Sequence, residues 1–544
     1  EAVTLDTQGG TKRLIETRLG RSIVYESLSG DSLTVGAASG GGSANPYALV
    51  QQGGTLDDTV TSAPGTDLVV GFQNTIGALS PDGEAWCGWA LRLDATAATP
   101  RLTFTDPSAW LDEERAFWEA YHAPETPPED LTDQELAVFR QSTAVLKMAQ
   151  VTPLDACPSG RCAGQILASL PPGQWNIAWV RDQVYATLAL LRTGHQEEAR
   201  ASLEFLTGAE VRKDGALPYY QHRFLESTDA APGVWGLGIP MTADVRLSLA
   251  RYYGSGLEES DANAAGPNIE FDNLGLFLWA FAEAVETLPD GAAFRYDHWE
   301  FATQGVADVL LELIEPATGL LYPDSSIWER HFCPHGACPE PETRKHHAYS
   351  TLQAAHGLGR MAALAADEGD AERAEAYAAA ASALSAALTE KLVVTAPGAL
   401  GPALAGNLEE LPFDVYYFDV AVIDAVNLGI VPADSALASA TTAALDTYLR
   451  MGPETPGYRR SDDPTWYDQQ EWLFCDLRMA SAFWRMGQAA RARTLLDWAT
   501  AIATANFGVL PELLDIDGAA QGAIPMVGFG AGVYLLALMD MLGG

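Results

Sequence analysis

The second part of the chain repeats one pattern, and this repetition constrains the fold more than any other feature. From Trp175 onward, apolar residues recur at three- and four-residue steps in about twelve segments. The segments are centred near about 185, 202, 246, 280, 305, 355, 380, 421, 442, 479, 495 and 535. Short turns alternate between them with longer loops rich in Gly, Pro and aromatic residues. Twelve helices in hairpin order predict an (α/α)6 toroid, whose long loops would wall a pocket at one end. A single helical stack is the alternative.

The first part of the chain has a different pattern. Residues 22–26 and 67–72 are short β-branched segments bounded by Gly, Ser, Asp and Pro, which is typical of an antiparallel β-sandwich. A chain of 544 residues also exceeds one ordinary domain. We therefore expect a β-sandwich domain at residues 1–110, a linker at 111–150 with a helix over 131–149, and the mainly α toroid at 151–544.

The charge of the chain limits its partners. Its net charge of -40 would repel nucleic acid and anionic membranes, so we expect neither as a partner. Residues 524–542 form an apolar stretch, but three glycines and Asp540 within it favour a buried helix over a membrane span. The chain begins at Glu1 without a signal peptide, and we expect that a leader has been removed. We expect a monomer.

Four of the six cysteines lie in two short loops. Cys157 and Cys162 close one loop and Cys333 and Cys338 close the other, and both loops contain Pro and Gly. Two local disulfides are expected, which implies an oxidising compartment and hence a secreted or periplasmic protein. The other two cysteines, Cys87 and Cys475, are expected either as a third pair or as buried thiols.

A zinc site is the alternative for the second of these loops. The potential ligands in this segment are His331, Cys333, His335, Cys338, His346 and His347. The Cys-x4-Cys spacing is loose for zinc, and Pro334 and Gly336 favour a closed turn. We therefore expect a disulfide there, with no metal and no cofactor.

Residues 175–182 combine large aromatic rings with an adjacent charged pair. Trp175 and Trp179 precede Arg181 and Asp182, which lie where a loop enters a helical pattern. Arg offers forked donors and Asp offers acceptors, so the pair with its Trp neighbours suits a molecule that is rich in hydroxyls. The alternative is an Asp favoured by the helix dipole, with Arg181 as its local partner.

Two long loops each place one Glu beside apolar residues. Residues 322–330 contain Trp328 and Glu329, and residues 507–515 contain Glu512. The ionised form of a carboxyl against a Trp ring is destabilised, so Glu329 can donate a proton while Glu512 stays ionised. Two carboxyls in unlike surroundings are what glycoside hydrolysis requires. The alternative is a pair of structural carboxylates with Arg partners, such as Glu329 with Arg330.

A third loop, at residues 457–472, again combines arginines, aspartates and aromatic residues. It contains Arg460 and ends at Trp472. The composition suits a polyol, and a surface loop of salt bridges is an equal alternative.

Together these motifs resemble the glucoamylase family of inverting glycoside hydrolases, glycoside hydrolase family 15, including bacterial glucodextranase-like and isomaltose-cleaving members. The likeness runs from about residue 139 to residue 537. Residues 139–147 look like the linker helix of the family, and residues 164–169 with 175–182 look like its entry to the sugar pocket. Ile327, Trp328 and Glu329 are similar to the general-acid motif, residues 457–472 to the arginine loop, and Glu512 holds the position of the general base.

The resemblance implies an exo-acting enzyme that releases β-glucose from the non-reducing end of an α-1,4- or α-1,6-linked glucan or oligosaccharide. Glu329 would be the general acid and Glu512 the general base, with their carboxyl groups roughly 6.5–9.5 Å apart to admit a water. The implied substrate-binding residues are Trp175, Trp179, Arg181, Asp182, Trp328, Arg460 and Trp472.

The chain also departs from the family pattern. Leu513 stands where the family commonly has Gln, residues 528–531 read Gly-Phe-Gly-Ala where it has Trp-Ser-Tyr/His-Ala, and residues 233–238 do not match its acceptor-side sequences. These departures leave the sugar, linkage and chain length open. The alternatives are a trehalase-like or phosphorolytic toroid enzyme, and a toroid that binds carbohydrate without catalysis.

Overall fold

The computed structural model divides the chain into two compact units, residues 1–123 and 124–544, which are described separately. It describes all residues except 1, 8–11, 19–20, 29–32, 40–44, 61–67, 76–77, 94–95, 97, 101, 103–105, 153–161, 172, 212–238, 240, 260, 262–267, 331–344, 396–400, 410–416, 453–454, 516–523 and 544.

The first unit contains two antiparallel sheets. One has the strand order β1 (Ala2–Asp6), β2 (Arg13–Arg18), β3 (Arg21–Ser27) and β6 (Trp89–Leu93), and the other pairs β4 (Leu33–Ser39) with β5 (Leu68–Asn74). Val3 and Leu14 from the first sheet pack with Val35 and Ala37 from the second. Alternate strand residues thus form a core between the sheets, as the period-two pattern predicts.

Two helices accompany these sheets, α1 (Pro46–Gln51) and α2 (Pro107–His122). The sequence pattern did not predict α2, because most of its side chains are exposed, including Trp110 and Phe117. Its N-terminus is fixed locally, since the Asp106 side chain accepts from the backbone N–H of Ser108.

The second unit is helical. Its inner helices are α4 (Val180–Thr193), α7 (Asp272–Thr287), α10 (Ala348–Glu368), η5–α12 (Val420–Ile423 and Asp424–Asn427), α14 (Leu473–Arg485) and η6–α16 (Val527–Gly532 and Val533–Leu542). Its outer helices are α3 (Asp133–Ala149), α5 (Gln196–Gly208), α8–η3–α9 (Gly291–Ala302, Thr303–Ala307 and Asp308–Glu312), α11 (Ala371–Lys391), α13 (Ala436–Tyr448) and α15 (Ala489–Ala505).

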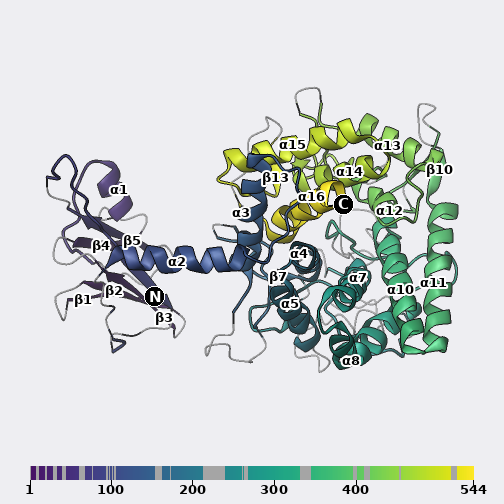
Figure 1. The fold of residues 1–544 in the computed structure, drawn as a ribbon, viewed down its shortest axis with the longest axis horizontal. Helices are drawn as coiled ribbons and strands as arrows, with labels where there is room; N and C mark the ends of the chain where they lie inside the picture. The colour runs from purple at the N-terminus through teal and green to yellow at the C-terminus, as the bar shows by residue number, and fades with distance from the viewer. Residues whose placement is uncertain are drawn as a thin grey trace, which may run out of the picture. The chain divides into compact units, whose positions relative to one another are not determined.

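The inner helices pack against one another in chain order, and α16 returns to pack against α4 (Figure 1). Each outer helix packs against the inner layer, as α11 does against α10 and α15 against α14. Every residue of α7 from 272 to 284 is buried, whereas α11 buries only Tyr377, Leu384, Ala387 and Leu388. The closed ring of two helical layers confirms the (α/α)6 toroid.

The helix expected near residue 246 is wrong. Residues 241–250 are not helical, although Val245 and residues 247–250 are buried. Partners distant in sequence satisfy the backbone of this segment: the N–H of Arg246 donates to the carbonyl of Gly305, and the carbonyl of Ala250 accepts from Val180. The four-residue step from Val245 to Leu249 therefore resembled the apolar spacing of a helix without forming one. The twelfth helical position of the ring is occupied by α3.

Short β-ladders tie together the loops at one end of this ring. They are β7 (Ala178–Trp179) with β8 (Arg251–Tyr252) and β9 (Glu258–Glu259), and β12 (Glu471–Trp472) with β13 (Leu513–Leu514). A further ladder joins β10 (Val393–Thr395) to β11 (Pro402–Leu404). Among the described helices, none is both long and apolar enough for a membrane span.

The cysteines are placed only in part. Cys162 is disulfide-bonded, but Cys157, Cys333 and Cys338 lie outside the described residues, so both expected pairings remain predictions. Cys87 is an exposed free thiol and Cys475 is a buried one. The third pair is therefore wrong, and the alternative of buried thiols holds for Cys475 but not for Cys87.

Candidate active site

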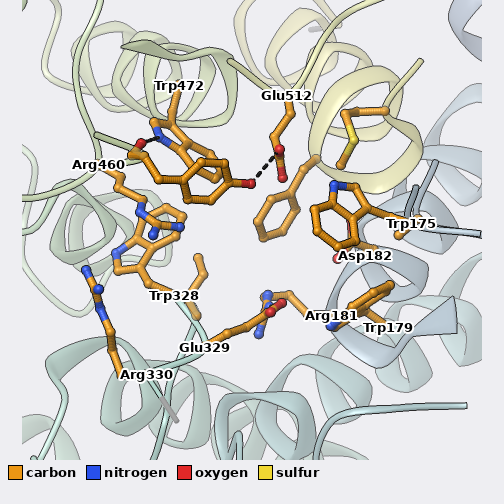
Figure 2. Close-up of a pocket in the computed structure, with 15 residues that line it drawn as sticks. Trp175, Trp179, Arg181, Asp182, Trp328, Glu329, Arg330, Arg460, Trp472 and Glu512 are labelled. Atoms are coloured by element: carbon orange, nitrogen blue, oxygen red, sulfur yellow. Dashed lines mark hydrogen bonds and ion pairs between the residues drawn. The ribbon is translucent and has the colours of Figure 1, made fainter. Parts of the chain in front are cut away.

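A cavity of about 340 Å³ lies at the N-terminal ends of the inner helices (Figure 2). Its lining residues are Ala168, Trp175, Trp179, Arg181, Asp182, Ile327, Trp328, Glu329, Arg330, Arg460, Tyr467, Trp472, Glu512, Met526 and Phe529. All nine residues expected to catalyse or bind thus line one cavity. The positive ends of the helix dipoles point toward it, which favours carboxylates and developing negative charge there.

Arg181 is the second residue of α4 and connects two carboxyls that are distant in sequence. Its Nη2 donates to Glu329 Oε1 at 3.0 Å, and its Nη1 donates to Glu270 Oε2 at 2.7 Å. The side chain is 1% exposed. The Phe529 ring lies 5.4 Å from the guanidinium carbon and covers it. The position of Arg181 is therefore set by its partners, and it cannot swing freely in the cavity.

Asp182, the next residue of α4, is also buried. Burial raises its pKa to about 7, which Arg181 opposes and which Glu329 and Glu512 reinforce. An Asp that titrates near neutral pH can either donate or accept a hydrogen bond. Such a group can hold a sugar hydroxyl in both of its protonation states.

The loop that carries Glu329 is held in an unusual conformation. Ser326 and Glu329 have φ angles of 51° and 56°, in the left-handed region that residues with a Cβ seldom adopt. Ser350 Oγ lies 2.9 Å from Ser326 Oγ and donates to Asp324 Oδ2 at 2.7 Å, which fixes the turn. Backbone strain that the surroundings hold in place is common at functional sites. The Glu329 side chain is 32% exposed and reaches the cavity.

Arg330 does not form the ion pair with Glu329 that a purely structural role of Glu329 would require. It donates to Asp463 Oδ2 at 3.2 Å and to Asp468 Oδ1 at 2.7 Å. The described ion pair of Glu329 is instead with Arg181.

Trp328 forms an apolar wall beside Glu329. Its Nε1–H donates to Asp419 Oδ1 at 2.8 Å, so the buried indole has a polar partner. The ring centre lies 5.6 Å from that of Trp472 and 6.0 Å from that of Phe474. On the far side, Trp175 and Trp179 meet edge to face at 5.9 Å. Aromatic faces thus bound the cavity on two sides.

Arg460 is enclosed by aromatic rings and one carboxylate. Its guanidinium carbon lies 4.5 Å from the Trp472 ring centre and 5.3 Å from that of Trp328. Its Nε donates to Asp468 Oδ1 at 2.7 Å. Burial alone would raise the pKa of Asp468, but Arg460 and Arg330 outweigh it and lower that pKa to about 2. This buried ion pair keeps the arginine loop in one geometry.

Glu512 lies across the cavity from Glu329 (Figure 2). The Tyr467 hydroxyl donates to Glu512 Oε2 at 2.6 Å. Burial raises the pKa of Glu512, while Tyr467, Arg460 and a hydrogen bond from Trp175 act in the opposite direction. The expectation that Glu512 stays ionised therefore depends on these three groups. Nothing in the sequence indicated that any of them contacts Glu512.

Sequence reasoning missed residues that complete the cavity. Tyr467 stood in the arginine loop without a role, and its distance of 45 residues from Glu512 gave no signal. Phe529 lies in the segment that departs from the family pattern. A Cβ on Gly528 would come within 2.0 Å of the Asp182 carbonyl oxygen, so η6 contacts the backbone of α4 directly. The glycine permits that contact, and Phe529 faces the cavity beside it.

Comparison with known proteins shows which family has this fold. The family described as Glycosyl hydrolases family 15 matches residues 144–465, more than half of the chain. A bacterial glucoamylase complexed with acarbose has a similar structure, with a TM-score of 0.66 and 15% identity over 98% of this chain and 74% of that one. No curated protein sequence matches the chain.

Two further solved structures share the fold. A glycosidase in complex with glucose has a TM-score of 0.56 and 20% identity, over 76% of this chain and 99% of that one. The glucoamylase from Saccharomycopsis fibuligera has a TM-score of 0.53 and 12% identity, over 76% and 97%. The family match and the shared toroid make this protein a glycoside hydrolase, and the chain belongs to glycosyl hydrolases family 15.

Proposed function

We propose that this enzyme hydrolyses α-glucosides from the non-reducing end and releases β-glucose by inversion. The observation that carries the proposal is the placement of Glu329 and Glu512 across one cavity, with Arg181 and Asp182 on its wall. Both carboxyls are partly exposed, and their surroundings differ as the reaction requires: Arg181 pairs with Glu329, whereas Tyr467 donates a hydrogen bond to Glu512.

Glu329 gives its proton to the glycosidic oxygen as the bond between that oxygen and the anomeric carbon breaks. Glu512 takes a proton from a water on the opposite face of the sugar, and the water oxygen bonds to the anomeric carbon. The electrons of the broken bond remain on the leaving oxygen. No covalent bond forms between sugar and enzyme, so the configuration inverts.

Arg181 and Asp182 hold hydroxyls of the non-reducing-end sugar, with Arg460 at the same ring or the next. Trp175, Trp179 and the Trp328–Trp472 wall contact its C–H faces. A site built from buried hydrogen-bonding groups discriminates strongly, because a missing substrate hydroxyl leaves those groups unpaired.

Glucose as the sugar is supported by the similar structures, one described with glucose and one with acarbose. Their identity to this chain is low, so the linkage is best settled by a panel of α-1,4-, α-1,6- and α,α-1,1-linked glucosides. Purified protein should release glucose from at least one of them.

NMR of the first product tests the mechanism. β-Glucose should appear before mutarotation, and Glu329→Gln and Glu512→Gln should each lower kcat by about 10²–10⁴-fold or more. α-Glucose as the first product would contradict both roles. Glucose 1-phosphate formed in phosphate buffer would instead indicate phosphorolysis.

A further inference from the structure

Arg181 forms an ion pair with a carboxyl that does not line the cavity. Glu270 lies just before α7, is 0% exposed, and accepts from Arg181 Nη1 at 2.7 Å. The same oxygen, Oε2, accepts from Asn273 Nδ2 at 3.2 Å. The backbone N–H of Glu270 donates to the carbonyl of Leu249 at 2.8 Å, so the main chain is anchored as well. Glu270 therefore has a fixed position relative to Arg181.

The two ends of one guanidinium serve two different carboxyls. Nη1 meets Glu270 inside the protein, and Nη2 meets Glu329 at the cavity. The guanidinium is planar and rigid, so its orientation at one end determines the direction of its donors at the other. A shift of Glu270 would move the donor that contacts Glu329.

Several carboxyls compete for this one cation. Asp272, on the first turn of α7, lies 3.5 Å from Arg181 Nη1 and also acts on its charge. Asp182 also acts on Arg181, and Asp261 faces Glu270. Burial raises the pKa of Glu270 and of Asp272, because it disfavours the charged form of each carboxyl.

The distances decide which of these carboxyls pairs with the cation. A buried Arg stays charged, and leaving a buried charge without a counter-ion is costly. Glu270 accepts a hydrogen bond from Arg181 Nη1 at 2.7 Å, whereas Asp272 is 0.8 Å more distant from the same nitrogen. The shorter distance makes Glu270 the carboxylate that pairs most closely with Arg181.

We propose that Glu270 is a positioning residue, whose carboxylate orients Arg181 and neutralises part of its charge so that Glu329 can hold the proton it donates. This inference rests on the proposed role of Glu329. Glu270 does not touch the substrate; it acts only through Arg181. With Glu270 neutral, the full charge of Arg181 would act on Glu329 and favour its ionised form, which cannot protonate the leaving oxygen.

The test is the pH profile of kcat/KM for Glu270→Gln, which keeps the side-chain shape and removes the charge. We expect the basic limb to move to lower pH by about one unit or more. At neutral pH, kcat/KM should fall by about tenfold or more. Glu270→Asp keeps the charge and should leave the limb close to its wild-type position.

Glu283→Gln is the matched control. It removes another Arg–Glu pair between α4 and α7, which is partly buried and lies away from the catalytic cavity, with Glu283 Oε1 2.5 Å from Arg192 Nε. A loss of stability alone would reduce kcat with the folded fraction and leave the limbs in place, as we expect for this control.

The outcomes separate the two proposals. A wild-type pH profile for folded Glu270→Gln, beside an inactive Glu329→Gln, would overturn the role of Glu270 alone. Full activity of Glu329→Gln would overturn the proposed function itself. Identical limb shifts in Glu270→Gln and Glu283→Gln would show that loss of either acidic charge moves the limb, whether or not it contacts Arg181, and would also overturn the inference.

Discussion

Glu512 illustrates how single residues set the chemistry of this cavity. Burial opposes its ionisation, and the short hydrogen bond from Tyr467 together with Arg460 favours it. Because the proposed base must be ionised to take a proton, the balance of these contacts determines the acidic limit of activity.

Tyr467→Phe should shift that balance. Loss of the hydroxyl removes a donor to the carboxylate, so the pKa of Glu512 should rise and the acidic limb of kcat/KM should move to higher pH by about one unit. The measurement is a pH–rate profile on a small glucoside. The basic limb should stay in place; movement of both limbs together would argue that the substitution disturbs the whole site.

At this scale the sequence identified the residues of the site that lie in local motifs. It did not identify the residues that contact them from distant parts of the chain. Trp328 and Glu329 are adjacent in the chain, so their combination is visible in the sequence. Glu270 lies 89 residues from Arg181, and Tyr467 lies 45 from Glu512. Only the folded ring brings such partners together, and neither residue stands in a local pattern that indicates a role.

At the scale of elements, apolar spacing located most of the helices, because each inner helix must bury residues at a helical period. Apolar spacing does not reveal a helix whose side chains are exposed, and it suggests a helix where a buried segment is not helical. α2 is a helix with mostly exposed side chains, and residues 247–250 are buried without being helical. The element that positions Phe529 is a π-helix, η6, which lies against α4.

Gly528→Ala should disrupt that contact. The added methyl would meet the Asp182 carbonyl oxygen at 2.0 Å, and neither backbone can move without shifting its helix. We expect a loss of at least about 2 kcal/mol in the free energy of unfolding, measured by urea denaturation.

Gly359→Ala is the control for this substitution. Gly359 is an exposed residue within α10, and its Cβ would lie 3.9 Å from the Ala381 methyl, an ordinary contact. We expect it to be neutral or to stabilise by up to about 1 kcal/mol, since alanine favours a helix. Equal losses in both variants would show that the contact between α4 and η6 is not the cause of the loss in Gly528→Ala.

At the scale of the molecule, charge and topology matter most. The net charge of -40 leaves the surface strongly self-repelling at neutral pH, while the arginines at the site are neutralised by buried carboxylates. The change from period-two to helical patterning was enough to predict a β-sandwich followed by a toroid. Closure of the ring cannot be seen in any local window, because it depends on a contact between α4 and α16.

The charge predicts a salt response. Raising NaCl from about 0.01 M to about 1 M shortens the Debye length from about 30 Å to about 3 Å. Screening should weaken the repulsion and raise Tm at pH 7, measured by differential scanning calorimetry. The rise should vanish near the isoelectric point of about 4.4. A fall in Tm at pH 7 would mean that surface ion pairs outweigh the repulsion.

The packing of α16 on α4 also bears on how the protein is made. During synthesis α4 emerges some 350 residues before α16, so on a ribosome adding about 5–20 residues per second it waits on the order of a minute for its neighbour. Until then the ring is open, and apolar faces destined for its interior are available to other chains. A chaperone that shields the nascent chain during this interval would therefore be expected to determine how much enzyme a cell obtains.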